Sequence, residues 1–204
     1  MQRNCRPARS GSTSSPMRPR YHTEAIVLGR TPHGEASASL SLLTPEFGLV
    51  RARAQGIRSS GAKLAPALQT LALADVILVR GKETWRLSGA LIGERYAATL
   101  SPSSKARAGR IARLLLRLMQ GESSDHAPFF ILKGFLEALP SLPDAEADAA
   151  ECLAALRLLQ TLGLDAGDLP GDDYDFSADV LQAIEVGKRT YVTRVNRGIE
   201  ASGL

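Results

Sequence analysis

The sequence has few of the residues that build covalent or metal-bound frameworks. It contains 2 cysteines and 3 histidines among 204 residues. Cys5 and Cys152 form no Cys-x-x-Cys pair, so neither a disulfide framework nor a structural zinc site can be assembled at a useful spacing. The scattered histidines do not combine with a nucleophile and an orienting group. The sequence therefore predicts no metal, no cofactor, no small-molecule substrate and no catalytic site.

Long apolar runs are also lacking. No stretch approaches the roughly 20 residues needed to cross a bilayer, and the first residues lack the apolar centre of a secretory signal. The expected location is the cytoplasm, with no membrane partner. Residues 1–20 are rich in Arg, Ser and Pro, which predicts a disordered basic tail. Two interpretations of this tail stay open: translation naturally starts at Met17, or the tail is a basic arm that touches nucleic acid.

Acidic residues are absent from one long segment. The 28 residues between Glu46 and Asp75 contain no Asp or Glu. Residues 1–100 hold 14 Lys and Arg against 6 Asp and Glu, whereas residues 101–204 hold 11 against 15. Because a globular surface usually intersperses the two signs, a segment of one sign predicts a polyanionic partner, most simply a nucleic-acid backbone. The alternative is a strand edge that positive charge protects from aggregation.

Apolar periodicity divides the chain into two regions. Period-two alternation predicts five strands before residue 100, and five short strands favour an OB-fold barrel. After residue 101 the apolar spacing becomes helical, and Ser103 is the expected N-cap of the first helix. The predicted fold is α+β, with a five-stranded OB-fold β-barrel over 21–100 and an α-helical bundle over 101–204. The predicted strands are 24–30, 37–44, 49–56, 75–81 and 84–94, and the predicted helices run from 103 to about 121, from 125 to 139, from 144 to 163, from 177 to 187 and over 190–202.

Basic side chains recur in places where they share a face. On strand 49–56, Arg51 and Arg53 point the same way as Gln55, because side chains two apart lie on one face of a strand. The loop after this strand, the turn near residue 81 and the first helix add further candidates, with a serine as a neutral phosphate donor. The predicted nucleic-acid contacts are Arg51, Arg53, Arg58, Ser59, Lys63, Arg80, Lys82, Arg86, Arg110, Arg113 and Arg117.

Two of these groups have alternative interpretations. Trp85, next to Arg86, could be a platform for base stacking, but it shares a face with Leu87 and more often such a residue belongs to the core. The arginines of the first helix, placed opposite Leu114 and Leu118, could be a solvated bundle face, an extension of the nucleic-acid surface, or a receptor for an acidic tail of a partner.

A series of short stretches carries a resemblance to a known family. They are TEAIVLGR (23–30), GEAS (34–37), LLTPEFG (42–48), AQGIRSS (54–60), ALQ (67–69) and LVRGKETWRL (78–87), followed in the second half by LLQTLGL (158–164) and VNRGIEASGL (195–204). In order and spacing they resemble bacterial RecO, the family of recombination-mediator DNA repair proteins. Many members carry a four-cysteine zinc module after the LGL segment. Here that place reads DAGDLPGDDYDFSAD, which removes zinc from the prediction.

The resemblance implies a function that the residue patterns alone do not give. RecO-like proteins bind single- and double-stranded DNA and promote annealing of complementary strands. They also bind the acidic, apolar C-terminal tail of the single-strand-binding protein, and work with RecR to load recombinase onto gaps. The resemblance thus implies a non-enzymatic, nucleoid-associated DNA repair mediator. The alternatives are an interaction adaptor and an RNA-binding OB protein. A nuclease would need clustered carboxylates, and the only dense group, Asp172, Asp173, Asp175 and Asp179, is interpreted as a solvated loop and helix start.

Overall fold

The fold was obtained as a computed structural model, which describes residues 19–33, 37–55, 68–82 and 84–203. Residues 1–18 of the predicted tail lie outside the described residues, as do the loop candidates Arg58, Ser59 and Lys63.

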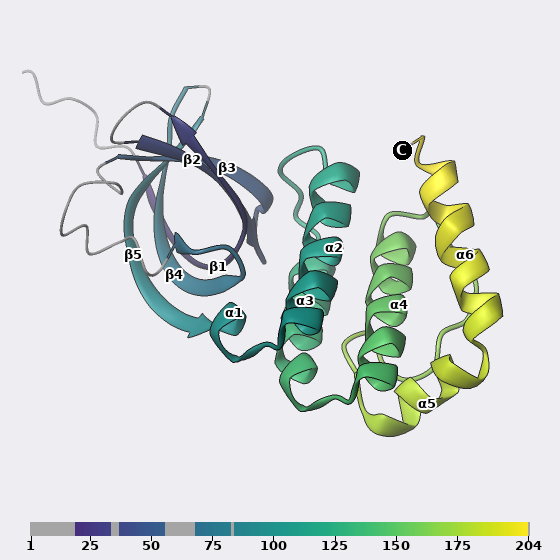
Figure 1. The fold of residues 1–204 in the computed structure, drawn as a ribbon. Coiled ribbons are helices and arrows are strands. Elements are labelled where there is room, and N and C mark those ends of the chain that lie inside the picture. Colours follow the sequence, from purple (N-terminus) through teal and green to yellow (C-terminus); the bar gives the residue numbers. More distant parts are fainter. Residues whose placement is uncertain (1–18, 34–36, 56–67, 83, 204) are drawn as a thin grey trace, which may run out of the picture.

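Five strands form a closed antiparallel barrel with one parallel pairing (Figure 1). The strand order around the barrel is β1-β2-β3-β5-β4, which confirms the predicted OB-fold. The first strand is longer than predicted at both ends. The strands are β1 (Arg20–His33), β2 (Ser37–Thr44), β3 (Gly48–Gln55), β4 (Ala72–Arg80) and β5 (Trp85–Arg95).

The barrel interior is filled by the alternate apolar residues that the period-two pattern marks. Leu40, Leu42 and Val50 are fully buried there, whereas Leu43 points out of the barrel wall. An aromatic cluster packs against this interior. The rings of Tyr21 and Phe47 each lie within 5.4 Å of the Trp85 ring, measured between centroids.

The chain after the barrel is helical. Each of the five predicted helices is present, joined by two short elements that the sequence pattern did not indicate. The predicted N-cap was wrong by two residues: the Ser101 side chain accepts a hydrogen bond from the Ser104 backbone N–H at 3.1 Å, because Pro102 occupies the first helical position. The elements are α1 (Tyr96–Thr99), α2 (Pro102–Leu118), α3 (Ala127–Ala138), η2 (Leu139–Ser141), α4 (Asp144–Thr161), α5 (Ala178–Val186) and α6 (Lys188–Ala201). None of the described helices is long and apolar enough to cross a membrane.

A second core joins one side of the barrel to the helices. Four apolar side chains of the barrel point outward and belong to the same buried cluster as the apolar residues of α2, α3 and α4: Ile26, Leu28, Leu43 and Leu49. Helices α2 and α3 consequently lie against the barrel, with α4 and α6 farther away (Figure 1). This packing leaves the outer surface of β3 and the start of β5 free to face solvent.

Candidate nucleic-acid interface

Strand β3 presents its arginines to solvent in the way its alternation predicts. Val50, Ala52 and Ala54 are buried, whereas Arg51 and Arg53 are exposed. Strand β5 runs parallel to β3 at this point, and Arg86 is the register partner of Arg53. The outer surface of two neighbouring strands therefore carries three arginines.

The pairing of Arg53 with Arg86 is electrostatically unfavourable by itself. Neighbouring strands lie about 4.8 Å apart, and like charges directly opposite each other destabilise a sheet. Among the described residues, no carboxylate forms a salt bridge with Arg51, Arg53 or Arg86. An external anion bound across the two strands would remove this repulsion.

Two serines on β2 complete the surface. Ser41 pairs with Arg51, and Ser39 pairs with Arg53, so these serines lie on the same face of the sheet as the two arginines. A hydroxyl can donate to a phosphate oxygen without adding charge. The sequence-based prediction did not include these serines, although the Ser-Leu alternation that places them outward was visible. We call Arg51, Arg53, Arg86, Ser39 and Ser41 the cationic face.

The turn between β4 and β5 is different from the prediction in one respect. Lys82 is exposed, but Arg80 is engaged within the chain: its Nη2 donates to the Glu122 carboxylate at 2.9 Å, and its guanidinium lies 5.1 Å from the centre of the Trp85 ring. Trp85 is only 4% exposed and donates its indole N–H to the same carboxylate at 2.9 Å. Trp85 is therefore a core residue, and the stacking interpretation was wrong.

Glu122 is held at this position by backbone contacts between the α2–α3 connection and the barrel. Gly48 forms an isolated β-bridge with Glu122, and the Ser123 backbone N–H donates to the Phe47 carbonyl at 3.0 Å. Gly48 has a φ of +62°, and a Cβ atom there would lie 2.9 Å from the Ser123 nitrogen. Only glycine fits such a left-handed, closely approached position.

A crevice of about 560 Å³ lies between the barrel and the end of α2. Its walls include Arg51 from β3, Arg117 from α2 and Glu122. The predicted helix arginine Arg117 is thus brought next to Arg51 of the cationic face, although more than 60 residues separate these two arginines in the sequence.

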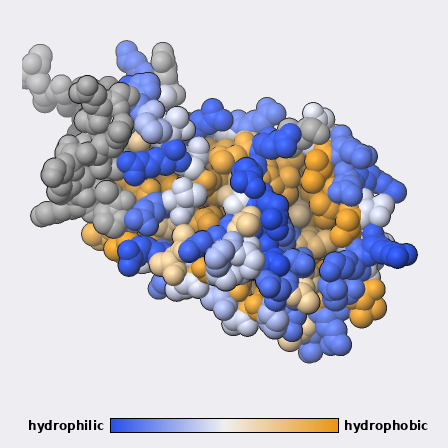
Figure 2. Space-filling view, in the orientation of Figure 1, coloured by the Kyte–Doolittle hydropathy of each residue, from blue (hydrophilic) through white to orange (hydrophobic). Residues whose placement is uncertain are grey.

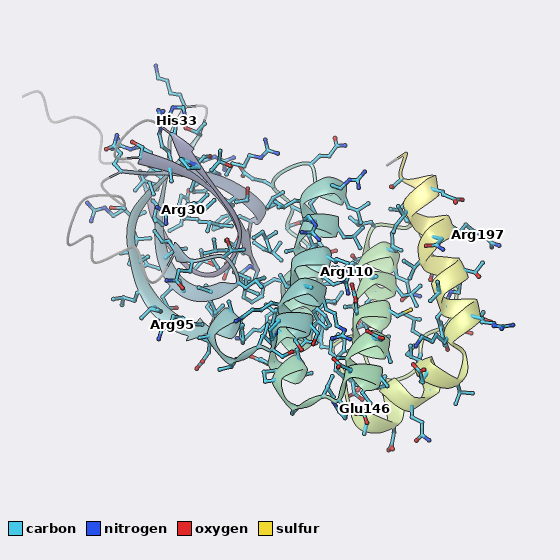
Figure 3. All side chains as sticks on the ribbon, in the orientation of Figure 1. Arg30, His33, Arg95, Arg110, Glu146 and Arg197 are labelled. Carbon is cyan, nitrogen blue, oxygen red and sulfur yellow. The ribbon has the colours of Figure 1, made fainter. Side chains whose placement is uncertain are left out.

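The other two helix arginines have different surroundings. Arg110 on α2 faces α4 (Figure 3) and forms a bidentate pair with Glu151, with both N···O distances at 2.6 Å. Arg113 is exposed, and no carboxylate among the described residues forms a salt bridge with it. The placement of Leu114 on the opposite side was wrong, because Leu114 lines the same groove as these arginines.

The comparison with protein families agrees with this geometry. Residues 17–94 match the family model described as recombination protein O N terminal, and this range contains the five strands except for Arg95, the last residue of β5. Over these residues the chain is similar to the N-terminal part of the RecO family.

Curated relatives from several bacteria bear the name DNA repair protein RecO. The relative from Dehalococcoides mccartyi is 32% identical over 127 residues, which cover 62% of this chain and 50% of the relative. The relative from Heliobacterium modesticaldum is 32% identical over 144 residues, or 70% of this chain and 51% of the relative. The relative from Synechococcus elongatus is 38% identical over 94 residues, or 46% and 32%. The chain spans about half the length of the first two RecO relatives.

The helical part of the chain contains an apolar groove of about 490 Å³ between α2, α4 and α6. Figure 2 shows hydrophobic surface over α4 between the polar ridges of α2 and α6. Its floor includes Cys152, whose pKa is raised to about 11 by burial and by the neighbouring Glu151 carboxylate, so the thiol stays neutral at physiological pH. The groove rim carries Arg110, Arg113, Arg117 and Lys188.

The connection between α4 and α5 is organised by an arginine. Arg157, only 3% exposed, donates to the backbone carbonyls of Asp175 (2.8 Å), Pro170 (3.3 Å) and Asp172, and its guanidinium lies over the Phe176 ring. Within the part of the chain that the structure describes, His, Cys, Asp and Glu form no group of three or more that could hold a metal ion. We call Arg157 and its carbonyl partners the arginine clasp.

Proposed function

We propose that the protein is a non-enzymatic mediator of DNA repair and recombination that binds single- and double-stranded DNA through phosphate contacts. The observation that carries the proposal is the register pair of Arg53 and Arg86 beside Arg51, three exposed arginines without a carboxylate partner among the described residues. Such a surface attracts any polyanion, and the similarity to DNA repair proteins named RecO favours DNA as that polyanion.

Strand annealing follows from this mode of binding. Contacts to phosphates position a strand but leave the base edges unread. Trp85, the residue closest to a stacking platform, is buried and held by Glu122. A strand bound at the cationic face would therefore keep its bases available to pair with a complementary strand.

The apolar groove is the proposed binding site for the single-strand-binding protein. An acidic tail with apolar residues complements an apolar floor surrounded by arginines, of which Arg113 and Arg117 form no salt bridge within the described residues. Cooperation with RecR in loading recombinase onto gaps is proposed from the similarity to RecO proteins alone.

A salt series tests DNA binding. With about five phosphate contacts, the slope of log K against log salt for a single-stranded oligonucleotide should be near −3.5, from roughly −0.7 per contact. We expect the triple variant Arg51→Ala, Arg53→Ala, Arg86→Ala to reduce the slope to about −1.4 and to weaken binding at low salt. Fluorescence anisotropy measures both quantities.

The matched control removes the same number of charges elsewhere. Arg95, Arg189 and Arg197 are exposed and belong to neither the cationic face nor the groove rim; two of them are labelled in Figure 3. Their triple alanine variant should keep a slope near −3.5. Equal losses in the two triple variants would mean that net charge, and not the cationic face, holds the DNA.

An interaction adaptor that binds RNA is the second candidate, and the apolar groove is the observation that favours it. Phosphate contacts alone do not distinguish the two nucleic acids, because the 2′-hydroxyl must be read for that. Competition between DNA and RNA oligonucleotides of one sequence separates the candidates. Preference for RNA, together with no binding of the single-strand-binding protein tail, would favour the adaptor.

A further inference from the structure

Arg117 lines both of the cavities described above. It contributes to the crevice that contains Arg51 and also to the rim of the apolar groove. It is the one described residue that the linings of the crevice and the groove have in common. The two surfaces that the proposed function assigns to different ligands therefore meet at one guanidinium group.

The basic residues form one continuous path from the cationic face, through the crevice, to the rim of the apolar groove. Arg51 and Arg53 lie two residues apart on β3, and Arg51 faces the crevice. Arg117 closes the crevice from the last turn of α2, and Arg113 lies one helical turn earlier, about 6 Å farther along the groove rim. A polyanion that follows the cationic face toward the helices thus reaches the rim through Arg117.

The other cations of the rim are less available for sharing. Arg110 is fixed by two hydrogen bonds to Glu151. Lys188 pairs with Glu185 on the other side of the groove, at 3.1 Å. An acidic ligand in the groove would therefore draw on Arg113 and Arg117, and Arg117 is the one that the crevice also uses.

We propose that single-stranded DNA on the cationic face and an acidic peptide in the groove compete for Arg117, so that each ligand weakens the binding of the other. This inference rests on the proposed function. Both ligands are anionic, so simultaneous occupation would leave one of them without its Arg117 contact and would place like charges close together. Because binding free energies are linked, the weakening is equal in both directions.

The experiment measures this coupling directly. A labelled dT oligonucleotide longer than about 16 nucleotides, the upper end of one OB-fold site, is titrated with the full chain at low salt. The titration is repeated with a saturating synthetic peptide that carries several Asp residues followed by apolar residues and a free carboxylate. We expect the DNA dissociation constant to rise about fivefold, and the peptide dissociation constant to rise by the same factor in saturating DNA.

Variants separate sharing of Arg117 from general repulsion. Arg117→Ala should still bind both ligands, each more weakly, but the coupling factor should fall to about one. Arg197→Ala, which removes an exposed charge from α6 outside the groove rim, should keep the fivefold factor. A factor that persists in Arg117→Ala would overturn the inference.

The failures of the two proposals are distinguishable. If wild-type protein binds both ligands and the factor is one or below, the competition is wrong and the proposed function stands. If the wild-type protein binds no DNA at low salt, the proposed function is wrong, and the competition is wrong with it.

Discussion

At the scale of single residues, Glu122 is the feature that most limits the cationic surface. It places a negative charge in the crevice and holds Arg80, which the sequence predicted as a DNA contact. Replacement by glutamine removes the charge but keeps an oxygen that can accept from the Trp85 indole N–H. Half-exposed ion pairs are worth up to about 1 kcal/mol, so little stability should be lost.

We therefore expect Glu122→Gln to bind single-stranded DNA about two- to fivefold more tightly, because Arg80 becomes available and repulsion from the carboxylate disappears. The salt slope should become steeper by up to about 0.7. Anisotropy titrations measure both effects. Glu146→Gln on α4 (Figure 3) is the control and should change neither. Unchanged affinity in Glu122→Gln would show that Arg80 contributes nothing to DNA binding even when released.

Cys152 gives a second prediction at this scale. Because burial raises its pKa to about 11, the reactive thiolate is scarce at neutral pH and increases as pH rises. In a Cys5→Ser background, the rate of alkylation by iodoacetamide should keep rising to about pH 10, whereas an unperturbed thiol levels off above its pKa of about 8.5. Acidic peptide in the groove should slow the reaction. A plateau near pH 8.5 would contradict the burial of the thiol.

At the scale of elements, the arginine clasp fixes the connection between α4 and α5. We expect Arg157→Lys to lose about 2 to 4 kcal/mol of unfolding free energy, because one ammonium group cannot reach the carbonyls on both sides of the segment and leaves buried acceptors unpaired. Urea unfolding measures the loss. Arg189→Lys, at an exposed position of α6, should be neutral within about 0.5 kcal/mol. Equal stability of the two variants would remove any structural role for the clasp.

Strands, helices and their contacts differ in how far the sequence predicts them. Strands and helices follow from local periodicity, so all five strands and the five long helices were predicted. The outward direction of Arg51 and Arg53 also follows from alternation within one strand. The pairing of Arg53 with Arg86 and of Arg110 with Glu151 depends on elements that meet only in the folded chain, 33 and 41 residues apart. Local pattern contains no signal for such contacts, which is why the fate of Arg80 and Arg110 was not predicted.

At the scale of the whole molecule, the barrel and the helical bundle have separate topologies but share one packed core. The apolar side chains that leave the barrel wall, Leu28 and Leu49 among them, are buried in the cluster that also contains the core of α2, α3 and α4. Separation of the two parts would expose this surface at a cost of roughly 25 cal/mol per Å². The predicted boundary near residue 100 therefore should not act as a boundary in unfolding.

We expect the full chain to unfold in one cooperative step. Trp85 is the single tryptophan and reports on the barrel through its fluorescence, whereas far-ultraviolet circular dichroism reports mainly on the helices. The two urea transitions should have the same midpoint. Leu28→Ala, at the junction of the two parts, leaves a cavity in the core that they share. The substitution should lower the free energy of unfolding by about 2 to 5 kcal/mol and move both midpoints together. Transitions that separate in the wild type, or a Leu28→Ala shift confined to one probe, would mean that the barrel and the bundle are independent folding units.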